Sequence, residues 1–228
     1  MKYLLAALTG ICLFSACHQR NNDGKTLLFA DNFDSLELSP DWIIEMDSLP
    51  HSSVRVGNGK LTMDTKGGVT IWFNHLLNGN LQIEYTRKVV MENGPNDRVS
   101  DLNQFWMAVD PRNPDLFTRK GKFGEYDSLR LYYVGVGGNT NTTTRFRRYD
   151  GHGTRALLQE NNTPENLLRS NHAYHIKITV QNGESQFWVD GVCVFRYTDP
   201  APFGSGYFGF RSTWSRHEID NFKVFRLQ

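Results

Sequence analysis

From Leu27 to the end of the chain, apolar and polar residues alternate in short runs with a period of two, which is typical of β-strands. Asn-Gly pairs at 58–59, 78–79 and 182–183 separate several of the runs, and this dipeptide favours tight hairpin turns. The pattern predicts one all-β domain over residues 27–228, a sandwich or jelly roll built from about a dozen short strands. The clearest runs are 60–65, 69–74, 81–90, 105–110, 128–136, 174–180, 185–197, 207–212 and 219–227.

The first 17 residues have a different pattern. MKYLLAALTGICLFSAC contains one basic residue, an apolar run and two small residues before Cys17, which indicates a secretory signal peptide. Its apolar run is too short for a membrane-spanning helix. A cysteine directly after Ser-Ala resembles the lipobox of bacterial lipoproteins, with Phe14 in the place where Leu is usual. The resemblance implies a lipid anchor at Cys17 and a cell-envelope location, periplasmic or anchored to the outer membrane.

Ordinary cleavage near Ala16 is the alternative to lipidation. In either case, residues 18–26 are polar and predict a short tether between the signal peptide and the domain. Apart from Cys17, the chain after the signal peptide contains only Cys193, so burial rather than a disulfide must hold the domain together.

Charge is balanced over the whole chain, with 25 Lys and Arg against 24 Asp and Glu. A neutral total argues against nucleic acid as the partner. We expect a monomer, and we expect any electrostatic recognition to be local.

Two C-terminal segments, YHIKITVQNGESQFWVDGVCVFRY and GYFGFRSTWSRHEIDNFKVFRL, resemble the closing strands of concanavalin A-like (laminin-G-like) jelly rolls. The middle of the chain, from NGPNDRVSDLNQFW through GEYDSLRLYYVGVGGNTNTTTRFRRYDG, is similar to a family of secreted bacterial domains, domain of unknown function 6250. These resemblances imply a concanavalin A-like β-sandwich of two antiparallel sheets. They also imply a role in glycan metabolism, such as rhamnogalacturonan breakdown, but supply no catalytic residues.

The alternation also sorts side chains onto the two faces of each strand. The predicted inward set includes Ile71, Phe73, Leu81, Ile83, Tyr85, Phe105, Met107, Leu129, Leu131, Tyr133, Phe146, Phe208 and Phe210. The predicted outward set is Trp72, Glu84, Gln104, Trp106, Tyr132, Arg145, Arg147 and Arg211.

Aromatic and amide side chains on an outward face suit a saccharide, and exposed tryptophan is costly unless a ligand covers it. Arginine adds bidentate recognition of a carboxylate. We therefore interpret the outward set as a groove for an acidic, uronate-containing polysaccharide, with the loop residues Arg98 and Asp101 at its end. The alternative is that some of these side chains lie on the far sheet and that the arginines pair with Asp and Glu.

The groove residues match the needs of a polysaccharide lyase. Such an enzyme neutralises the uronate carboxylate, here through Arg145 and Arg147, and moves a proton, here through Tyr132 with His152 as a second candidate base. A non-catalytic carbohydrate-binding module and a glycoside hydrolase of the same fold are the alternatives. The chain lacks the E-x-D-x-x-E run of jelly-roll glucanases, which argues against the hydrolase.

No cofactor is expected. The histidines lack the spacing of a zinc site. Concanavalin A-like folds often hold a structural calcium ion, and Asp31 and Asp220 could contribute to one, although two carboxylates are few for an ion that takes six to eight oxygens.

Overall fold

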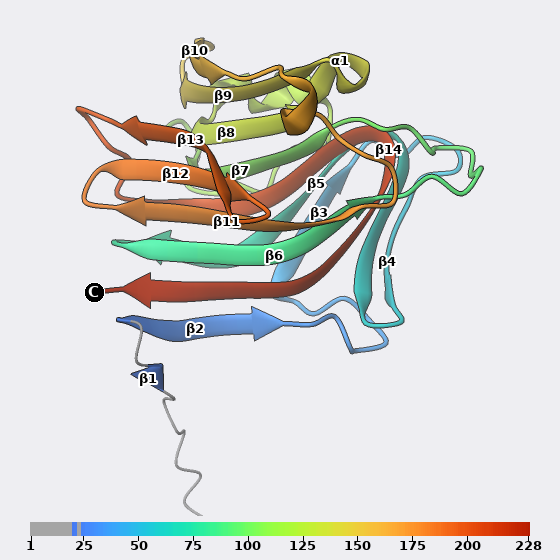
Figure 1. Ribbon diagram of the computed structural model, residues 1–228, viewed down its shortest axis with the longest axis horizontal. Coiled ribbons are helices and arrows are strands. Elements are labelled where there is room, and N and C mark those ends of the chain that lie inside the picture. The colour runs from blue at the N-terminus through green and yellow to red at the C-terminus, as the bar shows by residue number, and fades with distance from the viewer. Residues whose placement is uncertain (1–19, 22–23) are drawn as a thin grey trace, which may run out of the picture.

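The computed structural model describes residues 20–21 and 24–228, and most of these residues lie in antiparallel β-strands (Figure 1). The predicted signal peptide and Cys17 lie outside the described residues. The strands are β1 Arg20–Asn21, β2 Lys25–Asp31, β3 Trp42–Met46, β4 Ser53–Gly57, β5 Lys60–Asn78, β6 Leu81–Val89, β7 Leu102–Val109, β8 Arg130–Gly137, β9 Thr143–Asp150, β10 Arg155–Glu160, β11 Ala173–Gln181, β12 Glu184–Val189, β13 Val192–Thr198 and β14 Ser205–Leu227. Three short helical turns complete the list: η1 Phe123–Ser128, α1 Gly138–Asn141 and η2 Pro164–Asn166.

The strands form two packed layers. In the first layer, the order is β10-β9-β8-β7-β14-β5-β3, and in the second it is β13-β12-β11-β6-β14-β2. Figure 1 shows β11, β12, β13, β6 and β2 side by side with the C-terminal part of β14. This arrangement confirms the prediction of a concanavalin A-like jelly-roll sandwich.

Two long strands belong to both layers. Residues 205–213 of β14 pair with β7 on one side and with β5 on the other, and its later residues pair with β6, β2 and the first part of β5. The strand bends at Trp214, where the register shifts and φ is 41°. Opposite this bend, β5 carries Gly67 and Gly68, and a Cβ atom at Gly68 would overlap the carbonyl oxygen of Gly121 and crowd the Arg211 guanidinium.

The main hydrophobic core fills the space between the two layers. It contains most of the side chains that the alternation placed inward, so the prediction is confirmed for Ile71, Phe73, Leu81, Ile83, Tyr85, Met107, Phe146, Phe208 and Phe210. Aromatic rings meet throughout this core: Phe210, for example, stacks on Trp42 at 5.5 Å between ring centroids.

A second apolar cluster covers the outer face of the first layer. Residues 110–129 fold over this face and contribute Leu116, Tyr126 and Leu129, which pack on Trp72 and Phe105. Most face predictions for β7 and β8 are therefore wrong, with Met107 as the exception, and Leu129, which was predicted inward, belongs to this outer cluster. Phe105, Leu131 and Tyr133 lie on the outer face, whereas Trp106 and Tyr132 lie in the main core. Because both faces of these strands are buried against apolar groups, alternation alone does not say which face is the inner one.

Candidate functional site

A pocket of about 430 Å³ opens on the outer face of the first layer, beside the second apolar cluster. Strands β7, β8, β9 and β14 form its floor, and η1, α1 and β10 contribute to its walls. Five arginines line it, together with one carboxylate, two amides and two aromatic rings: Arg98, Arg145, Arg147, Arg155, Arg211, Asp101, Asn103, Asn139, Phe123 and Tyr133. Among the predicted site residues, Arg98, Asp101, Arg145, Arg147 and Arg211 meet in this pocket.

Arg211 lies at the floor and is only 1% exposed. Its guanidinium donates hydrogen bonds to the hydroxyl of Thr70 (3.3 Å) and to the carbonyl oxygen of Gly121. Burial lowers the pKa of Arg211, because the charged form loses its hydration. No carboxylate of residues 24–228 forms an ion pair with it.

Of the four other pocket arginines, three have a carboxylate partner. Arg98, Arg145 and Arg155 each form an ion pair, with Asp101, Glu160 and Asp127 respectively.

Arg147 differs from these three, because its guanidinium donates to the backbone carbonyl of Arg155 (3.0 Å) and pairs with no carboxylate in the described part of the chain. Arg147 and Arg211 thus leave two positive charges in the pocket without a counter-ion.

The side chains of Tyr133 and Asn103 both lie next to Gly135. Asn103 pairs with Gly135 across β7 and β8, and Tyr133 lies on the same face of β8. A Cβ atom at position 135 would overlap the Tyr133 hydroxyl and crowd Asn103 Oδ1, so glycine is required for the phenol to lie along the strand. Asn103 is 3% exposed, and its buried Oδ1 has no hydrogen-bond partner in the part of the chain that the structure describes. The pocket therefore contains a buried acceptor that needs a donor.

Phe123 supplies an apolar wall. Phe123 is 37% exposed, and the Arg155 guanidinium lies 4.5 Å from the centroid of its ring. Arg155 on β10 also forms an ion pair with Asp127, which belongs to η1 like Phe123. This ion pair holds η1 against β10. An exposed ring beside polar groups offers a flat surface for the C–H face of a sugar.

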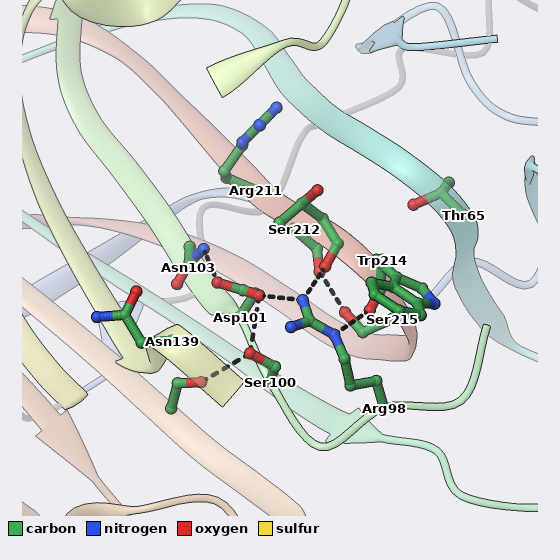
Figure 2. A network of polar contacts seen from close by, with 12 residues as sticks. Thr65, Arg98, Ser100, Asp101, Asn103, Asn139, Arg211, Ser212, Trp214 and Ser215 are labelled. Carbon is green, nitrogen blue, oxygen red and sulfur yellow. Dashed lines mark hydrogen bonds and ion pairs between the residues drawn. The ribbon is translucent and has the colours of Figure 1, made fainter. Parts of the chain in front are cut away.

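Arg98 and Asp101 form the centre of a polar network at one end of the pocket (Figure 2). Arg98 donates to the carbonyl oxygens of Thr213 and Trp214, both at 2.7 Å, and to Asp101. The carboxylate of Asp101 also accepts from the hydroxyl of Ser100 at 2.8 Å. The network fixes the loop before β7 to the bend of β14, and it occupies the oxygens of Asp101.

A second buried cation lies behind the pocket floor. Arg87 donates to the backbone carbonyls of Asn103 (2.7 Å) and Arg211 (3.0 Å) and to Nδ1 of His217 (3.1 Å). Burial lowers the pKa of Arg87 to about 10. Arg87 thus ties together the strands that present Asn103 and Arg211 and adds positive charge beneath them.

His217 does not activate a serine. Its Nδ1 accepts from Arg87, so its proton is on Nε2, which lies 3.0 Å from Ser212 Oγ and 2.8 Å from Ser215 Oγ. An Nε2–H group donates to these hydroxyls and takes no proton from them. Burial and the nearby Arg87 hold the pKa of His217 well below its usual value, which keeps the ring neutral.

Trp72 is not a ligand platform. Its side chain points to the outer face as predicted, but residues 110–129 cover it completely. The ring stacks on Phe105 at 5.6 Å, and the indole N–H donates to buried Glu45 at 2.8 Å. Glu45 also accepts from Tyr126 (2.9 Å), and burial raises the pKa of Glu45.

Three other predicted groove residues, Gln104, Trp106 and Tyr132, are buried in the interior, on the other side of the first layer from the pocket. Gln104 accepts from the phenol of Tyr85 (2.7 Å), and Trp106 packs in the main core. The Tyr132 hydroxyl bonds to Asp199, and burial with this carboxylate raises the pKa of Tyr132. None of these side chains lines the pocket.

Glu84 and His152 lie elsewhere. Glu84 is on β6 in the second layer, where Lys25 approaches it at 3.5 Å. His152 is exposed in the turn between β9 and β10 and lines a separate, shallower hollow with Asp127 and Ser128. The pocket instead gains Tyr133, Asn103, Phe123 and Arg155, which the sequence interpretation did not place in the site.

Among the residues described, no group of three or more His, Cys, Asp or Glu is placed to hold a metal ion. Asp31 uses its two oxygens to accept from Phe33 N (2.7 Å) and Trp42 Nε1 (2.9 Å), and Asp220 accepts from Asn221 N. Calcium binding by these two residues stays a prediction. Over the same described range, no helix is long and apolar enough to cross a membrane.

The sequence profile of the family described as "Domain of unknown function (DUF6250)" matches residues 63–222, which is well over half of the chain. No match to a curated protein was found.

Solved structures share the fold at low sequence identity. A Bacillus subtilis protein of unknown function with a galectin-like fold is 16% identical, with a TM-score of 0.70 over 89% of this chain and 97% of that one. The carbohydrate-binding module CBM66 of Bacillus subtilis is 14% identical, with a TM-score of 0.56 over 81% and 94% of the two chains. The endo-β-1,3-glucanase of Pyrococcus furiosus is 11% identical, with a TM-score of 0.62 over 90% and 97%.

Proposed function

This chain belongs to the family of domains of unknown function DUF6250, and on that premise we propose that its arginine-lined pocket binds a uronate-containing saccharide. The observation that carries the proposal is the set of unmet polar groups in one pocket. Within residues 24–228, Arg147 and Arg211 have no carboxylate partner, and the buried Asn103 Oδ1 has no donor. A ligand that pairs with the two arginines and donates to Asn103 must offer an anionic group and a hydroxyl group. A sugar acid has these two groups on one ring.

The rest of the pocket suits such a ligand. Phe123 presents an exposed ring for the apolar face of the sugar, and the pocket volume of about 430 Å³ admits one or two sugar residues. The similar structures include a carbohydrate-binding module and an endo-β-1,3-glucanase by name, which supports a saccharide ligand. Plant-type acidic polysaccharides such as rhamnogalacturonan are the substrates that the family resemblance favours.

If the domain is catalytic, the pocket favours elimination over hydrolysis. Hydrolysis uses two carboxyl groups on opposite sides of the glycosidic bond. Asp101 is the only carboxylate among the described residues that line the pocket, and Arg98 and Ser100 already engage it. Elimination instead needs a neutralised uronate carboxylate, which Arg147 and Arg211 would provide. A non-catalytic binding module stays the alternative.

The test compares one glycan in two charge states. We expect polygalacturonate or rhamnogalacturonan oligosaccharides to bind in isothermal titration calorimetry, and we expect the same oligosaccharides with chemically reduced carboxyl groups to bind roughly tenfold more weakly or worse. Equal affinity for the two forms, or no binding of either, would contradict the proposal. Ultraviolet absorbance of the unsaturated uronate, followed in the same samples, separates elimination from binding alone.

The cellular address is a further part of the proposal. We infer lipid attachment at Cys17 from the lipobox-like SAC sequence, and the domain would then act at the cell envelope. Cys17→Ser should shift the protein from the membrane fraction to the soluble fraction of fractionated cells, with a change in gel mobility. A variant that stays membrane-bound with unchanged mobility would show that Cys17 carries no lipid.

A further inference from the structure

We propose that Tyr133 is the catalytic residue that transfers the proton when a uronate in the pocket undergoes elimination. The inference rests on the proposed function, because the carboxylate bound by Arg147 and Arg211 is what makes the sugar reactive. It replaces the sequence-based choice of Tyr132, whose hydroxyl is bound to Asp199 in the interior.

The first argument is the position of the Tyr133 hydroxyl. Tyr133 lines the pocket, is 8% exposed, and lies along β8 with its oxygen above Gly135. The buried phenols of Tyr126 and Tyr132 donate to carboxylates, whereas the Tyr133 phenol has no hydrogen-bond partner among residues 24–228. Its oxygen is therefore free to exchange a proton with a ligand.

The second argument is the arrangement of charge around that oxygen. Arg147 and Arg211 line the same pocket, and the Tyr133 hydroxyl and Asn103 Oδ1 both lie next to Gly135. When a proton leaves carbon C5 of a uronate, negative charge spreads onto the carboxylate oxygens. Guanidinium groups already in place stabilise that charge without reorganisation. Tyr133 would thus act beside the groups that make the C5 proton acidic.

The reaction balances without an added reagent. The Tyr133 phenolate takes the C5 proton, the C5–H electron pair becomes the C4=C5 double bond, and the C4–O bond breaks. The leaving glycosidic oxygen then takes the proton back from Tyr133. Water does not enter, no electron acceptor is needed, and the products are a free chain end and an unsaturated uronate.

The step predicts a characteristic pH dependence. Burial raises the pKa of Tyr133, with Tyr149 and Asp101 adding to the rise, while Arg211 and Arg147 lower it. Arg155 on β10 adds a further positive charge to the pocket. The phenolate is therefore a minor species at neutral pH, and the elimination rate should increase as pH rises into the alkaline range.

The experiment uses two neighbouring tyrosines of one strand. Tyr133→Phe should keep the affinity for acidic oligosaccharide within a few-fold and lower the rate of unsaturated product formation by roughly a hundredfold or more. Tyr132→Phe should keep the rate and its alkaline pH profile, because its hydroxyl lies outside the pocket. Melting temperatures of both variants verify that they are folded.

The outcomes separate the two proposals. If the parent protein does not bind the acidic glycan, the proposed function fails. If the parent binds it but forms no unsaturated product at any pH, the inference about Tyr133 fails and the binding function stands. Product formation by Tyr133→Phe at the parental rate would also overturn the inference, even if binding and elimination are both real.

Discussion

Trp72→Ala should lower the free energy of unfolding by about 3–5 kcal/mol, the range found when large buried aromatic side chains are truncated. The indole is fully buried between Phe105 and the covering segment 110–129. Its removal leaves a cavity and takes one of the hydrogen-bond donors from the buried carboxyl of Glu45. Urea unfolding monitored by circular dichroism measures the loss. It is a large fraction of the stability of an ordinary domain.

Trp214→Ala is the matched control. This ring is 45% exposed at the bend of β14, so its removal should cost far less stability. The two variants also decide between the sequence interpretation and the structure. A ligand platform at Trp72 would give a variant of normal stability with reduced affinity for saccharide, and that result would contradict the covered position of the ring.

Arg147→Ala should weaken binding of an acidic oligosaccharide roughly ten- to hundredfold, which corresponds to about 1.5–3 kcal/mol for one charge-assisted contact. The melting temperature should change little, because the half-buried guanidinium makes only one hydrogen bond with the described residues, to the carbonyl of Arg155. Titration calorimetry with the carboxylated and the carboxyl-reduced oligosaccharide measures the effect. The loss should be confined to the carboxylated form.

Arg148→Ala supplies the control for Arg147→Ala. Arg148 is the next residue of β9, and its side chain pairs with Asp199 at 2.7 Å, away from the pocket. Its loss leaves a nearly buried carboxylate with less compensation and should lower stability while affinity stays unchanged. If both variants bound acidic oligosaccharide like the parent, Arg147 would be an ordinary surface residue.

The sequence predicts the arginine side of the pocket well. Phe146 is the one large apolar residue in TTTRFRRY, so it identifies the inner face of β9 and places Arg145 and Arg147 together on the other. Phe208 and Phe210 do the same for Arg211 on β14. In these strands, these phenylalanine side chains lie on one face and the pocket arginines on the other, so the alternation indicates one orientation.

The side of the pocket that Tyr133 forms could not be predicted in the same way. Every residue of β7 except the last is buried, and β8 is similar, because segment 110–129 covers the outer face with its own apolar side chains. The pattern LRLYYVGV therefore fits either orientation of β8. The prediction placed Tyr132 on the pocket side and Tyr133 in the core, whereas the structure has them the other way round. Only the spacing of Tyr133 and Gly135 indicates which tyrosine faces the pocket, because a glycine two positions after a tyrosine lets the phenol lie flat along the strand.

Phe123 and Arg155 reach the pocket from segments that follow no long apolar period, a short turn and an edge strand. Their positions depend on how residues 110–129 fold over the sheet and on the ion pair of Arg155 with Asp127. Such contacts join residues far apart in the sequence. Periodicity within one strand does not encode them.

The two-layer course of β14 has a consequence for the order of folding. Ser205–Leu227 is a central strand of both layers and pairs with β7, β5, β6 and β2. Until these last residues leave the ribosome, four strands made earlier have open edges, and neither the main core nor the Arg211 floor of the pocket can close. The domain therefore cannot assemble before β14 has been synthesised, which means slow folding through contacts of long sequence separation and a nascent chain that exposes edges prone to aggregation.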